Sequence, residues 1–316
     1  MKKINIGTSD LQVGPLNLGG NVFGWTLDET QSFDILNAFT AEGYNFIDTA
    51  DTYSVWKPGN IGGESETIIG NWMKVSGNRS DIILATKVGW DFGDGKRKGL
   101  SAKYIAQAAE ESLKRLQTDH IDLYYAHIDD ETVPVEETLT AYDKLIKEGK
   151  VRYIAASNLS PSRLTESLNL SEKMGLPKYQ ALQPHYNLLE RELFETEYAP
   201  IASAHHLTVF PYWSLAAGFL SGKYRSEEDL SKSIRGQDAA KYLNEKGLNV
   251  LKTLDIVAHK HNSVPATVAL AWLLAQPLVG APIVSATSKA QLATLFAAPK
   301  LKLDHEDLAL LDASSK

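Results

Sequence analysis

Short apolar segments alternate with longer amphipathic segments along nearly the whole chain, and this alternation limits the possible folds more than any other feature of the sequence. Eight short segments are runs of apolar and β-branched residues, as in strands that are covered on both faces. The longer segments between them place apolar residues at helical spacing. The predicted strands cover residues 15–19, 44–48, 82–87, 121–127, 151–157, 179–183, 208–212 and 281–285. The predicted helices cover residues 29–42, 64–75, 101–116, 135–147, 161–174, 191–205, 265–276 and 289–297.

Strands that alternate with helices form right-handed βαβ units in a parallel sheet. With eight strands, we predict an α/β fold of the (β/α)8 TIM-barrel type rather than an open doubly wound sheet. A dinucleotide-binding doubly wound sheet carries G-x-G-x-x-G after its first strand, and the sequence has neither this motif nor a Walker A loop. A β/α barrel takes about 250 residues and tolerates insertions, so residues 1–316 are predicted to form a single domain.

Two segments lie outside the repeating units. Residues 4–16, with a turn at Gly7-Thr8-Ser9-Asp10, are predicted to form a β-hairpin that caps the bottom of the barrel. The connection between the seventh and eighth strands is the longest, and residues 221–239 within it are rich in Ser, Lys and Gly. We predict a long mobile loop over the site here, with a disordered insertion as the alternative.

The charge balance and the missing residue types exclude several classes of function. A formal net charge of -7 argues against nucleic acid as a partner, because phosphate binding relies on Lys and Arg clusters. The sequence contains no cysteine, which excludes disulfides, thiolate catalysis and cysteine-ligated metals. The histidines lack the spacing of metal ligands, so no metal site is predicted.

No export or membrane signal is predicted. No apolar run follows the N-terminal lysines, as a secretory signal would require. Residues 268–286 are almost entirely apolar, but Pro277, Gly280 and Pro282 interrupt them, which favours a buried helix, a turn and a buried strand. We therefore expect a cytoplasmic protein that acts on small molecules and has no membrane partner.

Polar residues stand at the ends of most predicted strands. In a β/α barrel the carboxyl ends of the strands converge on one pocket, where site residues lie. A single histidine after a strand is more often structural, but a lysine that closes an apolar strand is unusual because a buried ammonium needs a partner. The strand-end residues are Asp48, Lys87, His127, Ser157, Asn158, Gln183 and Tyr212.

Three of these strand-end residues, Asp48, Lys87 and His127, suit proton transfer together with Tyr53. Tyr53 follows Asp48 by five residues, far enough for its hydroxyl to turn back over the barrel mouth. A free tyrosine has a pKa of about 10, and an adjacent Lys87 is expected to lower this pKa by stabilising the phenolate. Asp48 is expected to hold Lys87 charged, and His127 to donate a hydrogen bond to a substrate carbonyl. The set suits a general acid that protonates an alkoxide as hydride arrives.

Several sequence blocks, in order and across nearly the whole chain, resemble the aldo-keto reductase superfamily, both its bacterial-type members and the branch that is similar to potassium-channel beta subunits. The first is Phe46-Ile47-Asp48-Thr49-Ala50-Asp51-Thr52-Tyr53, followed by Gly63-Glu64-Ser65-Glu66. The others are Ala85-Thr86-Lys87, Asp122-Leu123-Tyr124-Tyr125-Ala126-His127, residues 149–158, Gln183-Pro184-His185-Tyr186-Asn187 and residues 218–224. The resemblance implies Tyr53 as acid and base, Asp48 and Lys87 as the residues that tune it, and His127 as the residue that orients the carbonyl.

The resemblance also implies a nicotinamide cofactor. It implies that Ser157, Asn158 and Gln183 bind the carboxamide and that the ring of Tyr212 stacks on the nicotinamide. Such a stack fixes the face that delivers hydride. The residues implied to wrap the pyrophosphate are Leu215, Gly218 and Lys223.

The chain departs from its relatives at two places. Trp213 and Ser214 stand where many relatives have Ser-Pro. Thr287 stands where relatives commonly have an arginine that pairs with the 2′-phosphate of NADPH, and an arginine grips phosphate through two bonds. We expect NADPH as the cofactor, with use of NADH also open. The residues expected at the 2′-phosphate are Ser288, Lys289 and Gln291.

Aromatic residues in the loops after the first three strands are predicted to face the substrate. They are Phe23, Trp25, Trp56 and Trp90. A mouth lined with these rings suits aldehydes, ketones or the faces of sugars, whereas surface tryptophans that pack on each other are the structural alternative. Asp129 and Asp130 after His127 suit either a polyol or a loop cap.

The predicted function is therefore NAD(P)H-dependent reduction of an aldehyde or ketone, including sugar-like ones, to the alcohol. A first alternative is a regulatory or binding protein of the same fold that keeps the cofactor pocket and has little turnover. A second is a phosphate-binding barrel enzyme such as an isomerase, for which Gly218 and Gly222 after the seventh strand give slight support. That second alternative leaves the pairing of Tyr53 with Lys87 unexplained.

Overall fold

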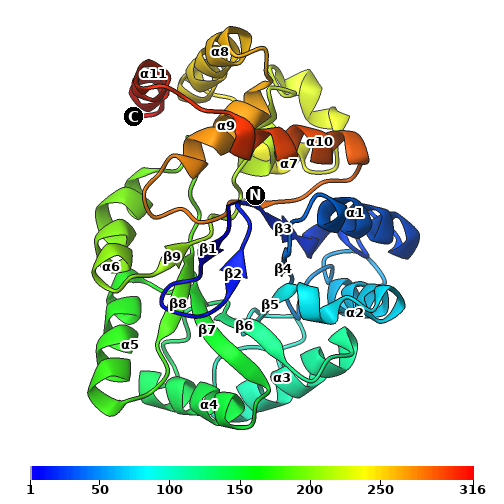
Figure 1. Cartoon of the computed structure of the whole chain (residues 1–316), viewed down its shortest axis with the longest axis vertical. Helices are drawn as coiled ribbons and strands as arrows, with labels where there is room; N and C mark the ends of the chain where they lie inside the picture. The colour runs from blue at the N-terminus through cyan, green and yellow to red at the C-terminus, as the bar shows by residue number, and fades with distance from the viewer. Residues whose placement is uncertain (1) are drawn as a thin grey trace.

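A computed structural model describes residues 2–316 and confirms the predicted (β/α)8 architecture. Eight parallel strands form one sheet in the order β10-β3-β4-β5-β6-β7-β8-β9. Helices lie around the outside of this sheet (Figure 1). The strands are β3 (Asn17–Gly19), β4 (Phe46–Asp48), β5 (Ile83–Val88), β6 (Ile121–Ala126), β7 (Val151–Ser157), β8 (Tyr179–Gln183), β9 (Thr208–Val209) and β10 (Ile283–Val284).

The helices follow the predicted pattern and add three that the apolar periodicity did not identify, α7, α8 and α11. Capping side chains explain several boundaries: Ser101 accepts a hydrogen bond from the Tyr104 amide, and Ser160 precedes a proline at the first turn. The helices are α1 (Glu29–Ala41), α2 (Glu64–Ser76), α3 (Ala102–Leu116), α4 (Val135–Lys147), α5 (Pro161–Met174), α6 (Ala199–Ala204), α7 (Gly236–Ala239), α8 (Glu245–Lys260), α9 (Pro265–Leu274), α10 (Lys289–Ala297) and α11 (His305–Ser315).

The prediction of one regular α-helix over residues 191–205 is wrong. A π-helical segment, η3 (Phe194–Tyr198), comes first and α6 follows it. Pro200 lies within this stretch and has no amide hydrogen to donate to the carbonyl four residues earlier. The regular α-helical hydrogen bonding is therefore interrupted before Pro200, which lies in the first turn of α6.

Barrel closure depends on short, irregular pairing between residues 208–212 and 278–283, which we call the seam. The Val209 amide donates to Leu278 O at 3.0 Å, and the Ile283 amide donates to Pro211 O at 2.9 Å. The regular strands β9 and β10 have two residues each, shorter than the predicted 208–212 and 281–285. Pro211 and Pro282 lack the amide hydrogen that a longer ladder needs.

The predicted hairpin is present as β1 (Ile4–Asn5) and β2 (Gln12–Val13), which pair antiparallel. It lies at the centre of the ring of helices in the view of Figure 1. Ile6, Leu11 and Val13 of this segment pack in the same buried cluster as the inward-facing strand residues. The hairpin thus closes the barrel interior at the amino ends of the strands, where the Gly7 amide donates to Thr208 Oγ1 at 2.7 Å.

The long connection after β9 consists of short helical turns rather than featureless loop. It contains η4 (Ala216–Ser221), η5 (Glu227–Lys232), α7 and η6 (Ala240–Tyr242) before α8 begins. Both guanidinium nitrogens of Arg225 bond to the Asp255 carboxylate, at 2.7 and 2.8 Å, and tie the connection to α8. None of the helices within residues 2–316 is both long and apolar enough to cross a membrane.

Candidate active site

The alternation of side chains along the strands brings polar residues to one end of the barrel interior. Successive strand residues point to opposite faces, so a residue two positions after an inward-facing one also points inward. Phe46, Ala85 and Ala181 belong to the interior cluster. Asp48, Lys87 and Gln183, each two residues further along, therefore continue the same face at the carboxyl ends of β4, β5 and β8.

Lys87 is fully buried, and all three of its ammonium hydrogens have acceptors. Its Nζ donates to a carboxylate oxygen of Asp48 in a very short contact, to Thr49 O at 2.7 Å and to the Tyr53 hydroxyl at 2.8 Å. The other carboxylate oxygen of Asp48 accepts a hydrogen bond from Gln183 Nε2 at 2.9 Å. The structure thus brings three of the four predicted proton-transfer residues into direct contact.

These contacts determine the charge of the pair. Burial by itself lowers the pKa of Lys87, but the Asp48 and Tyr53 contacts outweigh it and the pKa lies above its usual value. Burial raises the pKa of Asp48, while Lys87 and Gln183 oppose that rise. The ammonium with three acceptors keeps the pair ionised.

The charge of Lys87 acts to lower the pKa of Tyr53, as expected, but the net shift is upward. Burial raises the pKa of Tyr53 more than Lys87 lowers it, so the pKa of this phenol lies above its usual value. The physical reason is that an apolar surrounding disfavours the phenolate. Tyr53 consequently keeps its proton at neutral pH, which is the form that a general acid needs.

His127 follows β6, and its amide donates to Val88 O at 2.9 Å. Burial and the charge of Lys87 hold the pKa of His127 well below its usual range, so the ring is neutral. The ring centres of His127 and Tyr53 are 6.2 Å apart. Its Nδ1 is buried and has no hydrogen-bond partner among residues 2–316.

Three of the four predicted substrate-facing aromatics gather at the mouth. Trp56 and Trp90 are 45% and 46% exposed. The Trp25 and Trp56 rings meet edge to face at 5.7 Å, and Trp90 lies 5.2 Å from the His127 ring. Phe23 differs: it is fully buried within the core cluster that fills the space between the sheet and the helices, so its ring is not available to a ligand.

The residues expected around a nicotinamide form one network. Ser157 Oγ donates to Gln183 O at 3.0 Å, and Asn158 Nδ2 donates to His127 O at 2.9 Å. The Tyr212 hydroxyl donates to Asn158 Oδ1 at 2.9 Å. Asn158 adopts a left-handed backbone with φ 57°, which turns its side chain back toward these neighbours.

The residues expected at the phosphates lie further from this network. Leu215 is the N-cap of the η4 turn, and Gly218 lies within the turn, where it has φ 89° and a Cβ would come within 3.0 Å of Lys223 Nζ. Lys223 itself is exposed.

The three residues expected at the 2′-phosphate begin α10. Ser288 Oγ accepts from the Gln291 amide at 3.3 Å and caps the helix. Gln291 Oε1 accepts from the Thr287 amide at 2.8 Å. Lys289 extends toward α1, where its Nζ lies 3.1 Å from Asp34 Oδ1.

Arg235 is a site residue that sequence reasoning did not identify. Its guanidinium lies 5.6 Å from the centre of the Trp25 ring, and its charge acts to lower the pKa of Tyr53. It comes from the long connection after β9, and no motif marks it. Asp129 and Asp130 have structural roles: Asp129 Oδ2 accepts from the Ser160 amide at 3.0 Å and Asp130 Oδ2 from the Leu100 amide at 2.8 Å.

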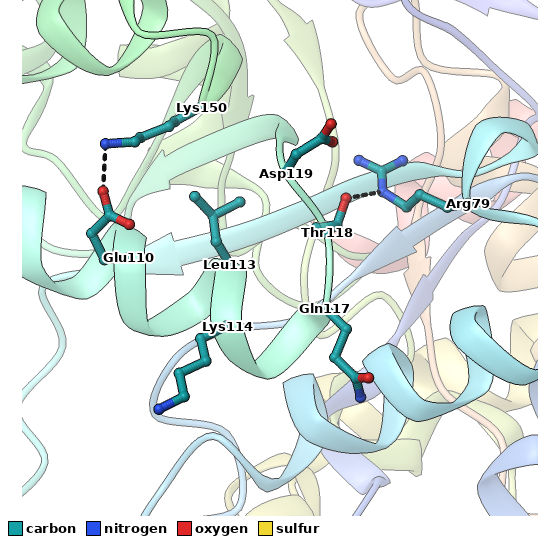
Figure 2. Close-up of a pocket in the computed structure, with 8 residues that line it drawn as sticks. All are labelled: Arg79, Glu110, Leu113, Lys114, Gln117, Thr118, Asp119 and Lys150. Carbon is teal, nitrogen blue, oxygen red and sulfur yellow. Dashed lines mark hydrogen bonds and ion pairs between the residues drawn. The ribbon is translucent and has the colours of Figure 1, made fainter.

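A hollow of about 750 Å³ lies elsewhere on the surface. Figure 2 shows Lys150 paired with Glu110 at 2.5 Å, and Arg79 Nε donating to Thr118 Oγ1 at 2.9 Å. Arg79, Asp119 and Lys150 precede β5, β6 and β7, so this hollow lies at the amino ends of the strands. None of the residues that line it is a predicted site residue.

Comparisons with known proteins agree with this architecture. The family model described as "Aldo/keto reductase family" matches residues 11–316. A Bacillus subtilis protein named "Uncharacterized oxidoreductase YrpG" is 35% identical over 318 residues, covering 99% of this chain and 95% of the relative. An Arabidopsis thaliana protein named "Probable voltage-gated potassium channel subunit beta" is 33% identical, covering 92% of this chain and 89% of the relative.

A third relative, "Aldo-keto reductase YhdN" of Bacillus subtilis, is 32% identical over 96% of this chain and 88% of its own length. The residues matched by the family model, 11–316, include every strand of the barrel and every residue of the candidate site. The chain is therefore a member of the aldo/keto reductase family.

Proposed function

We propose that the protein reduces an aldehyde or ketone to the alcohol with a nicotinamide cofactor, preferably NADPH. The observation that carries the proposal is the contact of the Tyr53 hydroxyl with a fully buried, fully bonded Lys87. Membership of the family and the names of its relatives support an oxidoreductase. A buried phenol that keeps its proton beside a cation suits the transfer of that proton to an alkoxide.

The donor groups of the site fit such a cofactor. Amide and hydroxyl groups of Ser157, Asn158 and Gln183 are suited to a carboxamide, and the half-buried ring of Tyr212 is suited to a flat heterocycle. The exposed ammonium of Lys223 beside the η4 turn, and the Ser288 hydroxyl and Lys289 on α10, are suited to phosphates. When bound, the nicotinamide supplies or accepts the hydride.

The residues of the chain perform the proton chemistry. His127, held neutral, donates one hydrogen bond to the carbonyl oxygen and orients it. Tyr53 gives its proton to the oxygen as negative charge develops there. Lys87 then stabilises the phenolate left behind, at a distance of 2.8 Å, and Asp48 keeps Lys87 in place.

The direct test is a cofactor titration followed by a turnover assay. We expect the purified protein to bind NADPH more tightly than NADH, as measured by the change in cofactor fluorescence on binding. We also expect it to oxidise NADPH when simple aldehydes are added. Binding without turnover against a broad carbonyl panel would favour a second candidate function, a regulatory cofactor-binding protein. The likeness to a protein named as a potassium-channel subunit is the observation behind that candidate.

The pH dependence of reduction follows from the charge states of Tyr53 and His127. Tyr53 must be protonated to act, and its raised pKa means that activity is lost only as the pH rises above about 10. The pKa of His127 is held well below its usual value, so His127 is neutral above about pH 6.5. We therefore expect kcat/KM for carbonyl reduction, measured at saturating cofactor, to be flat from about pH 6.5 to about pH 9.

The matched variant for this profile is His127→Gln, which keeps a neutral donor and cannot titrate. It should lower kcat/KM and leave the shape of the profile unchanged. An inflection near pH 6.5 in the wild type that disappears in His127→Gln would show that His127 titrates, contrary to the proposed neutral ring.

A further inference from the structure

Two contacts hold the side chain of Tyr212, and a third holds its backbone. Its hydroxyl donates to Asn158 Oδ1 at 2.9 Å, and its amide donates to Pro184 O at 2.9 Å. One face of the ring stacks on the imidazole of His185, with centres 5.3 Å apart and planes inclined by 15°. That face is therefore covered, and only the opposite face can receive another ring.

His185 is itself fixed by its neighbours. The Trp213 ring meets it edge to face at 5.4 Å, and Asn187 Nδ2 lies 3.5 Å from its Nε2. Asn187 Nδ2 also donates to Trp213 O at 3.0 Å. Burial lowers the pKa of His185, although Glu190 opposes this, so the imidazole is uncharged at neutral pH and stacks as a neutral ring.

Trp213 has its own support. Lys241 Nζ lies 5.4 Å from the centre of the Trp213 ring and 2.9 Å from Glu190 Oε1. Trp213 is one of the positions at which the chain departs from the Ser-Pro that many relatives have. The departure thus contributes a ring that packs edge to face against His185.

We infer that His185 is a positioning residue for cofactor binding: it forms a rigid support behind Tyr212 and directs a nicotinamide to the ring face opposite His185. This inference rests on the proposed function. Its effect acts through Tyr212, because His185 lies behind that ring and does not touch the reacting atoms. Without the support the Tyr212 ring gains freedom that cofactor binding must then remove.

The test compares two variants that both fill the space of His185 but differ in shape. His185→Phe keeps a flat ring, whereas His185→Leu keeps bulk without one. We expect His185→Leu to raise the Kd for NADPH about three- to tenfold, because one aromatic pair is lost. His185→Phe should stay within about twofold of the wild type, and the KM for the carbonyl should change in neither variant.

Two controls separate positioning from folding. His259→Ala removes an exposed histidine on α8 and should leave the Kd unchanged. Thermal unfolding without cofactor should give similar midpoints for the Leu and Phe variants. If His185→Leu does not fold, His185→Gln serves as a polar variant without a ring, with the same expected loss of affinity.

Two results would overturn the inference while leaving the proposed function intact. In one, His185→Leu binds NADPH as tightly as the wild type. In the other, His185→Phe binds as weakly as His185→Leu, which would assign the effect to the imidazole nitrogens instead of the ring. Failure of the wild-type protein to bind NADPH or NADH would overturn both the inference and the proposed function.

Discussion

Tyr53→Phe is expected to lower kcat for carbonyl reduction about 10²- to 10⁴-fold, the usual contribution of a positioned general acid. The variant removes only the hydroxyl, which accepts the Lys87 hydrogen bond at 2.8 Å. The ring itself remains 4.5 Å from Lys87 Nζ, so the attraction between cation and ring persists. NADPH binding should therefore stay close to that of the wild type in a fluorescence titration.

Tyr124→Phe is the matched control for this result. It removes a fully buried phenolic hydroxyl on the outward face of β6, and this hydroxyl has no hydrogen-bond partner among residues 2–316. Its kcat should equal that of the wild type. If Tyr53→Phe kept wild-type turnover in the same assay, another group would have to supply the proton and the proposed mechanism would fail.

The ion pair of Asp48 and Lys87 should show strong coupling in a double-mutant cycle. Lys87→Met leaves a buried carboxylate without its cation, and Asp48→Asn leaves a buried ammonium without its anion. Each single variant is expected to lower the free energy of unfolding by about 3–5 kcal/mol. The double variant removes both charges and should recover a large part of this loss, while turnover stays low in all three proteins.

Urea unfolding of the three variants measures this coupling, and a surface pair provides the reference. Lys147 on α4 lies 2.6 Å from Asp143 but is 74% exposed. Lys147→Met should change the free energy of unfolding by about 0.5 kcal/mol or less. Additive effects of the two buried substitutions would contradict the contact between Asp48 and Lys87, because independent sites show no coupling.

The parts of the fold that depend on local periodicity could be predicted, and those that depend on distant packing could not. Seven of the eight predicted helices, all but that of residues 191–205, begin and end within about two residues of the observed boundaries, as boundary signals usually allow. The helix α8 was missed although Asn244 caps it and Val250, Leu251 and Leu254 are buried along it. The Ser- and Lys-rich segment before it has the composition of a loop, and no strand separates that segment from the helix.

The same division applies to the candidate site. The physical cost of burying Lys87 pointed to a partner, and Asp48 is that partner in the structure. Phe23 could not be separated from Trp25 by sequence, because its burial depends on how the loops after two strands fold together. The pKa of Tyr53 likewise depends on the amount of protein packed around it, which no spacing encodes.

Arg235 belongs to this second class. Its position above Trp25 depends on the path of a connection that runs from β9 to α8. A guanidinium placed there by distant chain folding leaves no local motif. Residues of this kind become visible only when the three-dimensional arrangement is available.

The seam gives the barrel two halves of unequal stiffness. From β4 to β8 the strands share longer ladders, interrupted by one register shift between β7 and β8, and these strands carry Asp48, Lys87 and Gln183. Beside the seam, β9 and β10 have two residues each, and the groups proposed to hold the phosphates follow them. Local opening requires the least free energy where the ladder is shortest. For the proposed dinucleotide cofactor, we therefore expect exchange to proceed through local opening on the seam side, while the proposed proton-transfer groups keep their alignment.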